Sequence, residues 1–227
     1  IFVRQDPPFD MSYITSTFLL EYLENDVTII NRPSEIRNSP EKLFLNKWKY
    51  LTPKTLISGN YESIFKFREK YKNVIIKPLY GNGGSGVFYV KKDDKNFNSI
   101  LEMFLEKNSN QFILQEYIEE ITKGDKRIIL FNGEPVGAIN RIPSEQDIRA
   151  NLHVGGIAEK TTLTKKENQI CKEIGPTLKE KGLVFAGIDV IGERLTEINV
   201  TSPTGFREIF QFDGVNLAKK LLEIILK

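Results

Sequence analysis

The segment from 187 to 203, GIDVIGERLTEINVTSP, carries oxygen-bearing side chains whose types and spacing could bind a divalent metal ion. Glu197 and Asn199 are two residues apart on a predicted strand and therefore share a face. If the preceding turn is centred on Glu193, Asp189 lies directly across from Glu197, whereas a turn one residue longer or shorter puts them on opposite faces. Two carboxylates and an amide oxygen are hard ligands that suit Mg²⁺, which takes further ligands from water and phosphate. A solvated polar strand face is the alternative.

A glycine-rich loop lies in the segment KNVIIKPLYGNGGSGVFYVK, at 72–91. Gly81, Gly83 and Gly86 match the pattern G-x-G-x-x-G, but the β-rich segment that follows argues against a Rossmann site, which needs a helix there. The Gly-Lys-Ser/Thr ending of a Walker loop is also absent. A glycine loop between two strands is the kind of flap that protein kinases fold over ATP phosphates, although the kinase Lys-Asp-Asn motifs are missing. Lys77 could reach a phosphate as a point charge; a solvent-directed lysine and a plain hairpin are the alternatives.

Further polar residues could complete a nucleotide site. The predicted strand at 111–117 ends in polar residues that could offer backbone groups to an adenine edge. Asp125 could accept hydrogen bonds from ribose hydroxyls, although an exposed loop acid is the commoner explanation. Arg141 and Arg149 flank the aperiodic segment 143–160, and a loop of that length is usually functional or mobile. Guanidinium groups suit carboxylate or phosphoryl oxygens, but each arginine taken singly is more often a surface residue.

The histidine and the cysteine are not assigned to chemistry. His153 lies in the same aperiodic segment and is expected to pack in the loop or face solvent rather than act as a general base. Cys171 falls in a helical pattern and is expected in the core. With one residue of each type, no Cys/His metal spacing exists, and no internal disulfide can form. This usage favours a reducing, cytosolic setting.

The elements that must position these residues follow from periodicity and turn signals. Helices are predicted at 11–25, 41–48, 60–71, about 98–107, 164–182 and 215–226. Strands are predicted at 27–30, 74–77, 87–91, 111–117, 127–131, 134–142, 184–191 and 195–200. Ser39-Pro40-Glu41 is interpreted as a helix start, Thr164 and Glu167 as a capping box, and Asn132-Gly133 as a type I′ turn. This mixture indicates an α+β protein.

Composition bounds the class of protein. The 227 residues are 40% hydrophobic and 27% charged, which is enough for one large domain or two smaller ones. Lys and Arg number 32 against 30 acids and are dispersed, so no nucleic-acid surface is predicted. No stretch approaches the roughly 18 apolar residues of a membrane helix, and no signal peptide is visible. The first residues, IFVRQDPPFD, begin in what is interpreted as a strand, so we expect an upstream piece to be missing.

The order of these features resembles the ATP-grasp carboxylate-amine ligases, and within them the prokaryotic glutathione synthetases. The matching segments extend over nearly the whole chain: RQDPPFD, EKLF, GDKRIIL, IGPTLKEKGLVFAGIDVIG and RLTEINVTSPTGFREI. One departure is His153 in RANLHVGG, which is similar to sister ligases that add glutamate to protein or peptide C-termini. Those ligases usually space the metal acids more widely, so the short separation of Asp189 and Glu197 favours the glutathione synthetases.

The resemblance implies an α+β, ATP-grasp fold in which two subdomains clasp ATP. The expected divisions are 1–38, a remnant of an upstream α/β domain; 39–118, the central subdomain; and 119–227, the C-terminal subdomain with the metal site. It implies that the carboxylate of γ-glutamylcysteine attacks the γ-phosphate of ATP, and that the amine of glycine displaces the acyl phosphate to give glutathione, ADP and phosphate. The alternatives are a related ligase for glutamate or another amino acid, and a nucleotide-binding fragment without turnover.

The resemblance also implies roles for individual residues. Mg²⁺, with Mn²⁺ as the alternative, would be bound by Asp189, Glu197 and Asn199. ATP would be bound by Lys42, Lys77, Gly83, Gly84, Ser85, Glu116, Tyr117 and Asp125. Catalytic roles fall to Arg127, Arg141, Arg149 and Asn151, with the loop after Pro143 as a lid, and peptide contacts to Asp6, Ser202 and Arg207. We expect a cytoplasmic homo-oligomer that acts on small molecules and binds neither nucleic acid nor membrane.

Overall fold

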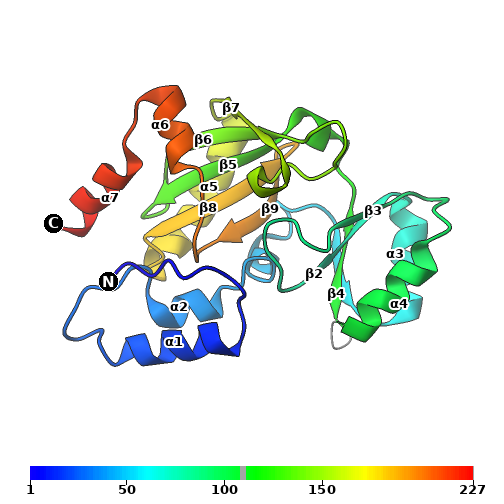
Figure 1. Ribbon diagram of the computed structural model, residues 1–227, viewed down its shortest axis with the longest axis horizontal. Coiled ribbons are helices and arrows are strands. Elements are labelled where there is room, and N and C mark those ends of the chain that lie inside the picture. Colours follow the sequence, from blue (N-terminus) through cyan, green and yellow to red (C-terminus); the bar gives the residue numbers. More distant parts are fainter. Residues whose placement is uncertain (108–110, 227) are drawn as a thin grey trace.

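Two antiparallel sheets form the framework of the molecule (Figure 1). The computed structural model describes residues 1–107 and 111–226, so residue 227, the expected end of the last subdomain, lies outside the described residues. The smaller sheet has the strand order β1-β4-β2-β3. Its strands are β1 (Thr55–Ser58), β2 (Val74–Pro78), β3 (Phe88–Val90) and β4 (Phe112–Glu116).

Two helices cover one face of this smaller sheet, α3 (Tyr61–Tyr71) and α4 (Phe97–Lys107) (Figure 1). Asn60 caps α3 by accepting a hydrogen bond from the Ser63 N–H at 3.0 Å. A buried cluster joins the helices to the strands and includes Ile64, Ile76 and Phe104. The packed face fixes β2, and therefore the position of Lys77 and of the glycine loop that follows it.

The larger sheet has the order β7-β6-β5-β8-β9. Its strands are β5 (Asp125–Phe131), β6 (Glu134–Ile142), β7 (Ile157–Lys160), β8 (Phe185–Ile191) and β9 (Arg194–Asn199). One face packs on α5 (Lys165–Glu180), with Cys171 and Ile174 in the buried cluster, so the core position predicted for Cys171 is confirmed. The opposite face packs at one end on α6 (Phe206–Asp213) and α7 (Leu217–Ile225).

Strand alternation explains how one face of β5 is both core and site. Asp125, Arg127, Ile129 and Phe131 lie on the same face because side chains alternate along a strand. Ile129 and Phe131 join the cluster under α6 and α7. Asp125 and Arg127, at the other end of the same face, line a cavity. The buried apolar residues at one end of β5 therefore fix the position of the polar residues at its other end.

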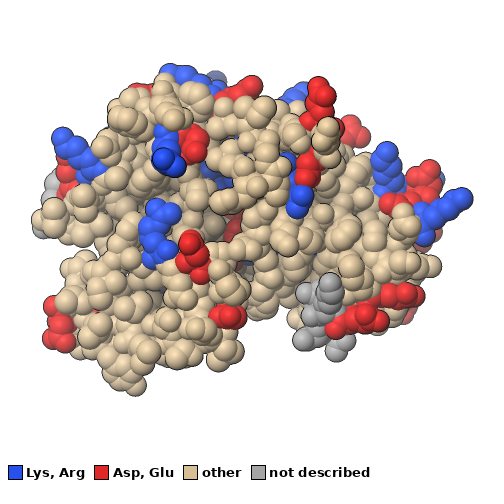
Figure 2. All heavy atoms as spheres, in the orientation of Figure 1, with Lys and Arg blue, Asp and Glu red and all other residues tan. Residues whose placement is uncertain are grey.

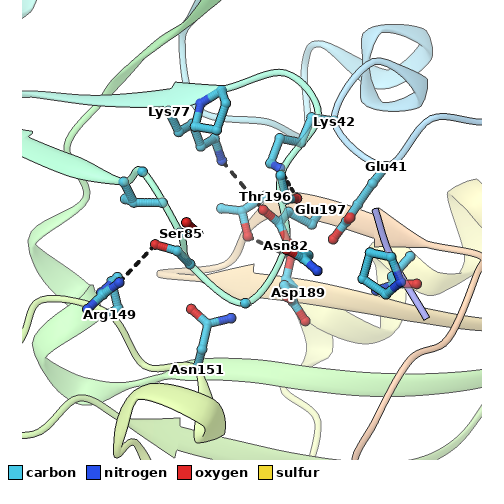
Figure 3. Close-up of a pocket in the computed structure, with 18 of the residues that line it drawn as sticks. Glu41, Lys42, Lys77, Asn82, Ser85, Arg149, Asn151, Asp189, Thr196 and Glu197 are labelled. Atoms are coloured by element: carbon cyan, nitrogen blue, oxygen red, sulfur yellow. Dashed lines mark hydrogen bonds and ion pairs between the residues drawn. The ribbon is translucent and has the colours of Figure 1, made fainter. Parts of the chain in front are cut away.

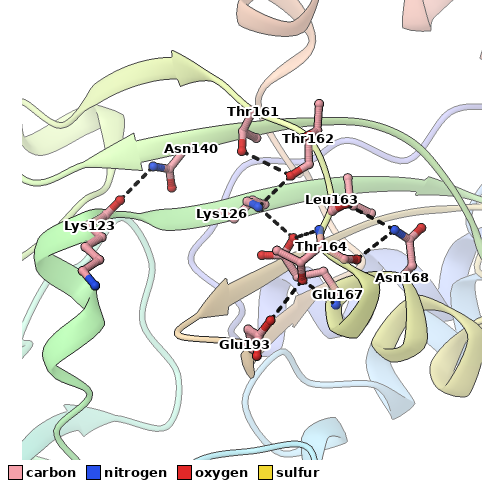
Figure 4. Close-up of polar contacts among 10 residues, drawn as sticks. All are labelled: Lys123, Lys126, Asn140, Thr161, Thr162, Leu163, Thr164, Glu167, Asn168 and Glu193. Atoms are coloured by element: carbon pink, nitrogen blue, oxygen red, sulfur yellow. Dashed lines mark hydrogen bonds and ion pairs between the residues drawn. The ribbon is translucent and has the colours of Figure 1, made fainter.

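A buried ion pair holds β5 on the face opposite to the cavity (Figure 4). Lys126 donates to Glu167 Oε2 at 2.7 Å and to the Thr162 carbonyl at 2.9 Å. Glu167 and Thr164 form the capping box that the sequence predicted for α5. The Thr164 hydroxyl also donates to Glu193 at 3.2 Å, in the turn between β8 and β9. The start of α5 is therefore hydrogen-bonded to β5 and to the turn between β8 and β9.

The N-terminal segment forms a small unit beside the larger sheet, with α1 (Met11–Glu21) and α2 (Pro33–Asn38) (Figure 1). Its buried residues include Val3, Tyr13 and Ile36. Three short 3-10 helices complete the described elements: η1 (Phe44–Trp48), η2 (Glu119–Lys123) and η3 (Leu152–Val154). Among the described helices, none combines the length and the apolar character needed to cross a membrane.

Three local predictions were wrong. The strand at 27–30 is reduced to a single bridge from Ile30 to Phe2, because the preceding Val27 is exposed and has no neighbouring strand. Ser39 ends α2 instead of capping a helix, its hydroxyl has no partner among the described atoms, and the residues after it form the 3-10 helix η1. The aperiodic segment 143–160 ends in β7, whose four residues are too few for a clear period.

The predicted hairpins were confirmed. Asn132 and Gly133 have φ values of 49° and 81°, and two positive φ angles are the mark of a type I′ turn. Asp189 pairs with Glu197 across β8 and β9. Figure 2 shows acidic and basic side chains interspersed on the visible face, with no massed basic patch there.

Candidate functional site

A cavity of about 1080 Å³ collects the residues that the sequence singled out. Its walls come from both sheets, from the glycine loop and from the N-terminal segment. The predicted residues that line it are Asp6, Lys42, Lys77, Gly83, Gly84, Ser85, Glu116, Tyr117, Asp125, Arg127, Arg141, Arg149, Asn151, Asp189, Glu197, Asn199 and Ser202. Arg207 is the exception, because it is exposed on α6 and does not line the cavity.

The pairing of Asp189 with Glu197 depends on a two-residue turn and a β-bulge, whose effects on the register cancel. Ile191 pairs with Arg194, so the turn has two residues and is not centred on Glu193. That turn alone would put Asp189 opposite Thr196. The register shifts between Asp189 and Val190, and the extra residue, Thr196, donates its hydroxyl to the Asp189 carbonyl at 3.1 Å. This bulge restores the facing carboxylates.

Two arginines hold the Asp189 carboxylate. Arg127 donates from two nitrogens, with 2.8 Å from its Nη2 to Asp189 Oδ2. Arg141 lies 2.9 Å from the same oxygen and also pairs with Asp125. All four side chains are buried. Burial alone would raise the pKa of Asp189, but the two guanidinium groups outweigh it and hold that pKa well below its usual range.

Two lysines face Glu197 (Figure 3). Lys77 Nζ lies 3.8 Å from Glu197 Oε1, and Lys42 donates to the Gly81 carbonyl at 2.8 Å, which joins it to the glycine loop. Burial acts to raise the pKa of Glu197, but Lys42 and Lys77 lower it on balance. Burial lowers the pKa of Lys77. Both ammonium groups are positioned to meet a further anion that enters the cavity.

Sequence reasoning missed Glu41, which lies against Glu197 (Figure 3). The Glu41 carbonyl accepts a hydrogen bond from the Ile198 N–H at 3.3 Å, which brings its backbone to the edge of β9. Burial and the neighbouring Glu197 raise the pKa of Glu41 well above its usual value. From the sequence, Glu41 was interpreted as an acid in the first turn of a helix. The signal that could have placed it in the site was its position next to Lys42, for which the resemblance implied ATP binding.

The glycine loop and the 143–156 loop touch across the cavity (Figure 3). Arg149 donates to the Gly84 carbonyl at 3.1 Å, while its guanidinium pairs with Asp147 at 2.6 Å. A Cβ built on Gly84 would lie 2.8 Å from Asn151 Oδ1 and 3.0 Å from Arg149 Cδ. The absence of a side chain at Gly84 is therefore what permits this close approach.

Replacing Gly84 with Ala is expected to reduce turnover. The new Cβ would separate the two loops, and φ at this position is +77°, which L-residues rarely adopt. With ATP, the substrate that the resemblance implies, kcat/KM should fall about 10-fold, since misplacement of a closing loop by a fraction of an ångström is costly. Gly83→Ala is the matched control, because φ there is +59° but nothing lies within 4 Å of its Cβ. Equal losses in steady-state kinetics of the two variants would contradict this account.

Tyr117, just after the end of β4, lines the cavity. The Tyr117 and Tyr89 rings stack with centroids 4.1 Å apart. The N–H groups of Glu116 and Tyr117 donate to the carbonyls of Lys54 and Asn73 at 2.9 and 3.1 Å. Glu116 Oε1 also accepts from the Lys54 N–H at 2.9 Å. These two N–H groups and this carboxylate oxygen are therefore hydrogen-bonded within the protein, so a ligand at this place would bind to other atoms.

Asp125 has one unused oxygen. Its Oδ2 pairs with Arg141, but its buried Oδ1 has no hydrogen-bond partner among the described atoms. Burial raises the pKa of Asp125 to about 7, against the opposing effect of Arg141. A buried acceptor without a donor is costly, so this oxygen is suited to a ligand hydroxyl.

The donor set fits a hard divalent cation. Asp189, Glu197 and Asn199 offer carboxylate and amide oxygens from adjacent strands to one cavity. Within the described part of the chain, no group of three or more His, Cys, Asp or Glu residues is arranged to hold a metal ion. A cation here would therefore need the amide of Asn199, water or a phosphate to complete its ligands. Asn199 Oδ1 meanwhile accepts from the Thr201 N–H at 3.2 Å.

Two solved structures are similar in fold to this chain. D-cycloserine synthetase DcsG is similar with a TM-score of 0.73 and 14% identity, over 98% of this chain and 82% of that protein. The D-alanine–D-alanine ligase of Bacillus anthracis, solved with ATP, is similar with a TM-score of 0.68 and 18% identity, over 93% of this chain and 72% of that one. At such identities the likeness shows the fold, which is ATP-grasp, as expected from the resemblance.

Sequence comparison is more specific. Residues 41–214 match the model of the prokaryotic glutathione synthetase ATP-grasp domain, and residues 1–37 match that of its N-terminal domain. The glutathione synthetase of Agrobacterium fabrum strain C58 is 54% identical over all of this chain and 71% of its own length. That of Brucella melitensis is 54% identical over 96% of this chain and 70% of its length. This chain belongs to the prokaryotic glutathione synthetase family.

Proposed function

We propose that this chain joins glycine to γ-glutamylcysteine at the expense of ATP, through an acyl phosphate, and releases glutathione, ADP and phosphate. Membership of the family, at 54% identity over the full chain, is the observation that carries this proposal. The cavity supports it, because acidic, basic and glycine-loop elements meet there as phosphoryl transfer requires. Use of ATP and of a divalent metal ion follows from the same membership.

Lys42 and Lys77 would hold phosphate oxygens, because each places an ammonium in the cavity beside Glu197. Glu197, Asp189 and Asn199 would hold the metal ion, which neutralises phosphate charge when bound. Gly83, Gly84 and Ser85 would cover the phosphates. The unused Oδ1 of Asp125 would accept a ribose hydroxyl, and adenine would lie beside the Tyr117 ring, where Ile118 also lines the cavity.

Arg127 and Arg141 would act as positioning residues. Both guanidinium groups are committed to Asp189 and Asp125, so their expected effect on the reaction is to hold these carboxylates. Arg149 and Asn151 remain the candidates for direct contact with the transferred phosphoryl group, since they meet the glycine loop at Gly84. Their contact with that loop would also close the cavity.

Closure has a chemical purpose in this reaction. The cysteinyl carboxylate oxygen attacks the γ-phosphorus, the bond to ADP breaks, and an acyl phosphate forms. The unprotonated amine of glycine then attacks the acyl carbon, phosphate leaves with the bonding electrons, and a proton is released. An acyl phosphate hydrolyses readily in water, so loops that exclude water protect the intermediate.

The direct test is phosphate release by the purified chain with ATP, Mg²⁺, γ-glutamylcysteine and glycine. We expect phosphate and glutathione in equal amounts, and we expect phosphate release only when both γ-glutamylcysteine and glycine are present. A panel of amine acceptors, including glutamate and alanine, tests the choice of glycine. Stabilisation by Mg²⁺-ATP in a melting assay without any ligation would instead indicate a nucleotide-binding protein.

We further propose that Mg²⁺ is the working ion and that the protein acts in the cytoplasm as a homo-oligomer without nucleic-acid or membrane partners. The hard oxygen donors support Mg²⁺. The buried Cys171 thiol, which makes no disulfide, is compatible with a reducing compartment. The interspersed charges in Figure 2 give no basis for nucleic-acid binding on that face. Activity profiles with Mg²⁺ and Mn²⁺, and light scattering for mass, test these points.

A further inference from the structure

Part of the cavity wall is used neither by the nucleotide nor by the metal ion in the function proposed above, and it includes Asp6 and Ser202, for which the resemblance implied peptide contacts. The N-terminal segment contributes Arg4 and Asp6, and the segment after β9 contributes Ser202 and Thr204. At about 1080 Å³, the cavity is slightly larger than the usual range for one small ligand, about 300–1000 Å³. The wall is therefore available for a second substrate beside a nucleotide.

Arg4 is distinguished from the other cavity arginines by its lack of an acidic partner. Arg127, Arg141 and Arg149 each pair with an aspartate. Arg4 makes no ion pair with any described residue, and its only described hydrogen bond is a long one of 3.4 Å to the Pro203 carbonyl. A guanidinium at a cavity wall without a carboxylate partner is suited to bind a carboxylate from a ligand in a bidentate manner.

Aromatic packing holds the Arg4 side chain in place. Its guanidinium carbon lies 5.7 Å from the centroid of the Phe185 ring and 5.8 Å from that of Phe2, which are cation–π distances. Phe185 is buried on β8, four residues before Asp189, so this contact joins Arg4 to the strand that carries a metal candidate. Arg4, an exposed residue of the N-terminal segment, is therefore held against a buried ring of the larger sheet.

Asp6 lies two residues from Arg4 and has the complementary charge. It is exposed, lines the cavity and makes no ion pair with any described residue. A cation and an anion without partners on one wall match a ligand that carries both charges. An α-amino acid group, with its carboxylate and its ammonium, is such a ligand.

We propose that Arg4 and Asp6 bind the α-amino acid group of the glutamyl residue, with Arg4 on its α-carboxylate and Asp6 on its ammonium. This inference rests on the proposed function. The peptide has two carboxylates, and the cysteinyl one must lie at the phosphate, beside Lys42 and Lys77. The glutamyl carboxylate then needs a cation elsewhere on the wall. Arg207, chosen from sequence for peptide contact, does not line the cavity.

Kinetics with two substrate analogues test the assignment. Arg4→Met should lower kcat/KM for γ-glutamylcysteine about 10- to 100-fold, the effect of one charged hydrogen-bonded contact, and leave KM for ATP unchanged. 4-Aminobutanoylcysteine lacks the α-carboxylate, so wild type should lose a similar factor with it and Arg4→Met should lose little more. Glutarylcysteine lacks the ammonium. Wild type should lose a similar factor in kcat/KM with it, and Asp6→Asn should lose little more.

Controls separate this inference from others. Arg32→Met, at an exposed arginine that does not line the cavity, should have wild-type kinetics, and a Mg²⁺-ATP melting shift equal to that of wild type shows that each variant is folded. If Arg4→Met and wild type discriminate equally against 4-aminobutanoylcysteine, the assignment of Arg4 is overturned. If the wild type ligates nothing, calorimetric binding of γ-glutamylcysteine in the presence of Mg²⁺-ADP still tests Arg4, because unchanged affinity in Arg4→Met would reject the site.

Discussion

Replacement of Glu197 with Gln is expected to lower kcat by about 10²- to 10³-fold, the loss that follows removal of one charge-stabilising group from a preorganised site. The substitution keeps the shape of the side chain and removes its charge. Lys77, 3.8 Å away, and Lys42 then lose the anion that offsets them, and the proposed metal ion loses a carboxylate. Phosphate release in steady state measures the effect.

A second readout separates metal binding from general damage. Titration with Mn²⁺, followed by electron paramagnetic resonance in the presence of ADP, should show weaker binding in Glu197→Gln. The matched control is Glu193→Gln, which alters a carboxylate of the same hairpin that does not line the cavity. Wild-type turnover and Mn²⁺ affinity in Glu197→Gln would show that this side chain takes no part in catalysis or metal binding.

The sequence predicted the facing carboxylates by a route that the structure corrects. Strand period and a turn centred on Glu193 led to the pairing of Asp189 with Glu197, but the turn has two residues and a bulge at Thr196 compensates. Gly192 is a turn signal in this segment, and in the structure both Gly192 and Glu193 adopt positive φ. They do not predict a bulge, because the hydrogen bond from Thr196 to the Asp189 carbonyl is a cross-strand contact.

Predictions failed where local signals had no packing partner. Val27 to Ile30 has the composition of a strand, but a ladder of hydrogen bonds to a neighbouring strand is needed to make one. Here Ile30 forms a single bridge to Phe2, and the Thr28 carbonyl accepts a hydrogen bond from the Ile1 amine. Ser39-Pro40-Glu41 has the composition of a helix start, but tertiary contacts prevail, since the Glu41 carbonyl bonds to β9. That same contact explains why Glu41 was missed, because its distance to Glu197 is fixed by the fold and not by sequence separation.

Replacement of Arg127 with Met is expected to destabilise the folded chain by about 3–5 kcal/mol, the usual cost of leaving one partner of a buried ion pair uncompensated. Asp189 would keep only its contact with Arg141, which also serves Asp125. The double variant Arg127→Met/Asp189→Leu should recover much of the loss, because no charge is then left without its partner at that position. Urea unfolding curves measure the three proteins, with Arg207→Met as an exposed control expected within about 0.5 kcal/mol of wild type.

The pH dependence of that difference identifies its electrostatic part. The folded-state pKa of Asp189 is depressed mainly by Arg127 and Arg141, against burial, so its contribution to stability is present above the unfolded aspartate pKa of about 3.9 and is lost as pH falls toward the folded value. The difference in unfolding free energy between wild type and Arg127→Met should therefore be full at pH 6 to 7, about two to three units above that pKa, and should narrow below about pH 4. A gap that stays constant down to pH 3, about a unit below it, would mean that Arg127 stabilises the sheet through packing of its side chain and not through the charge of Asp189.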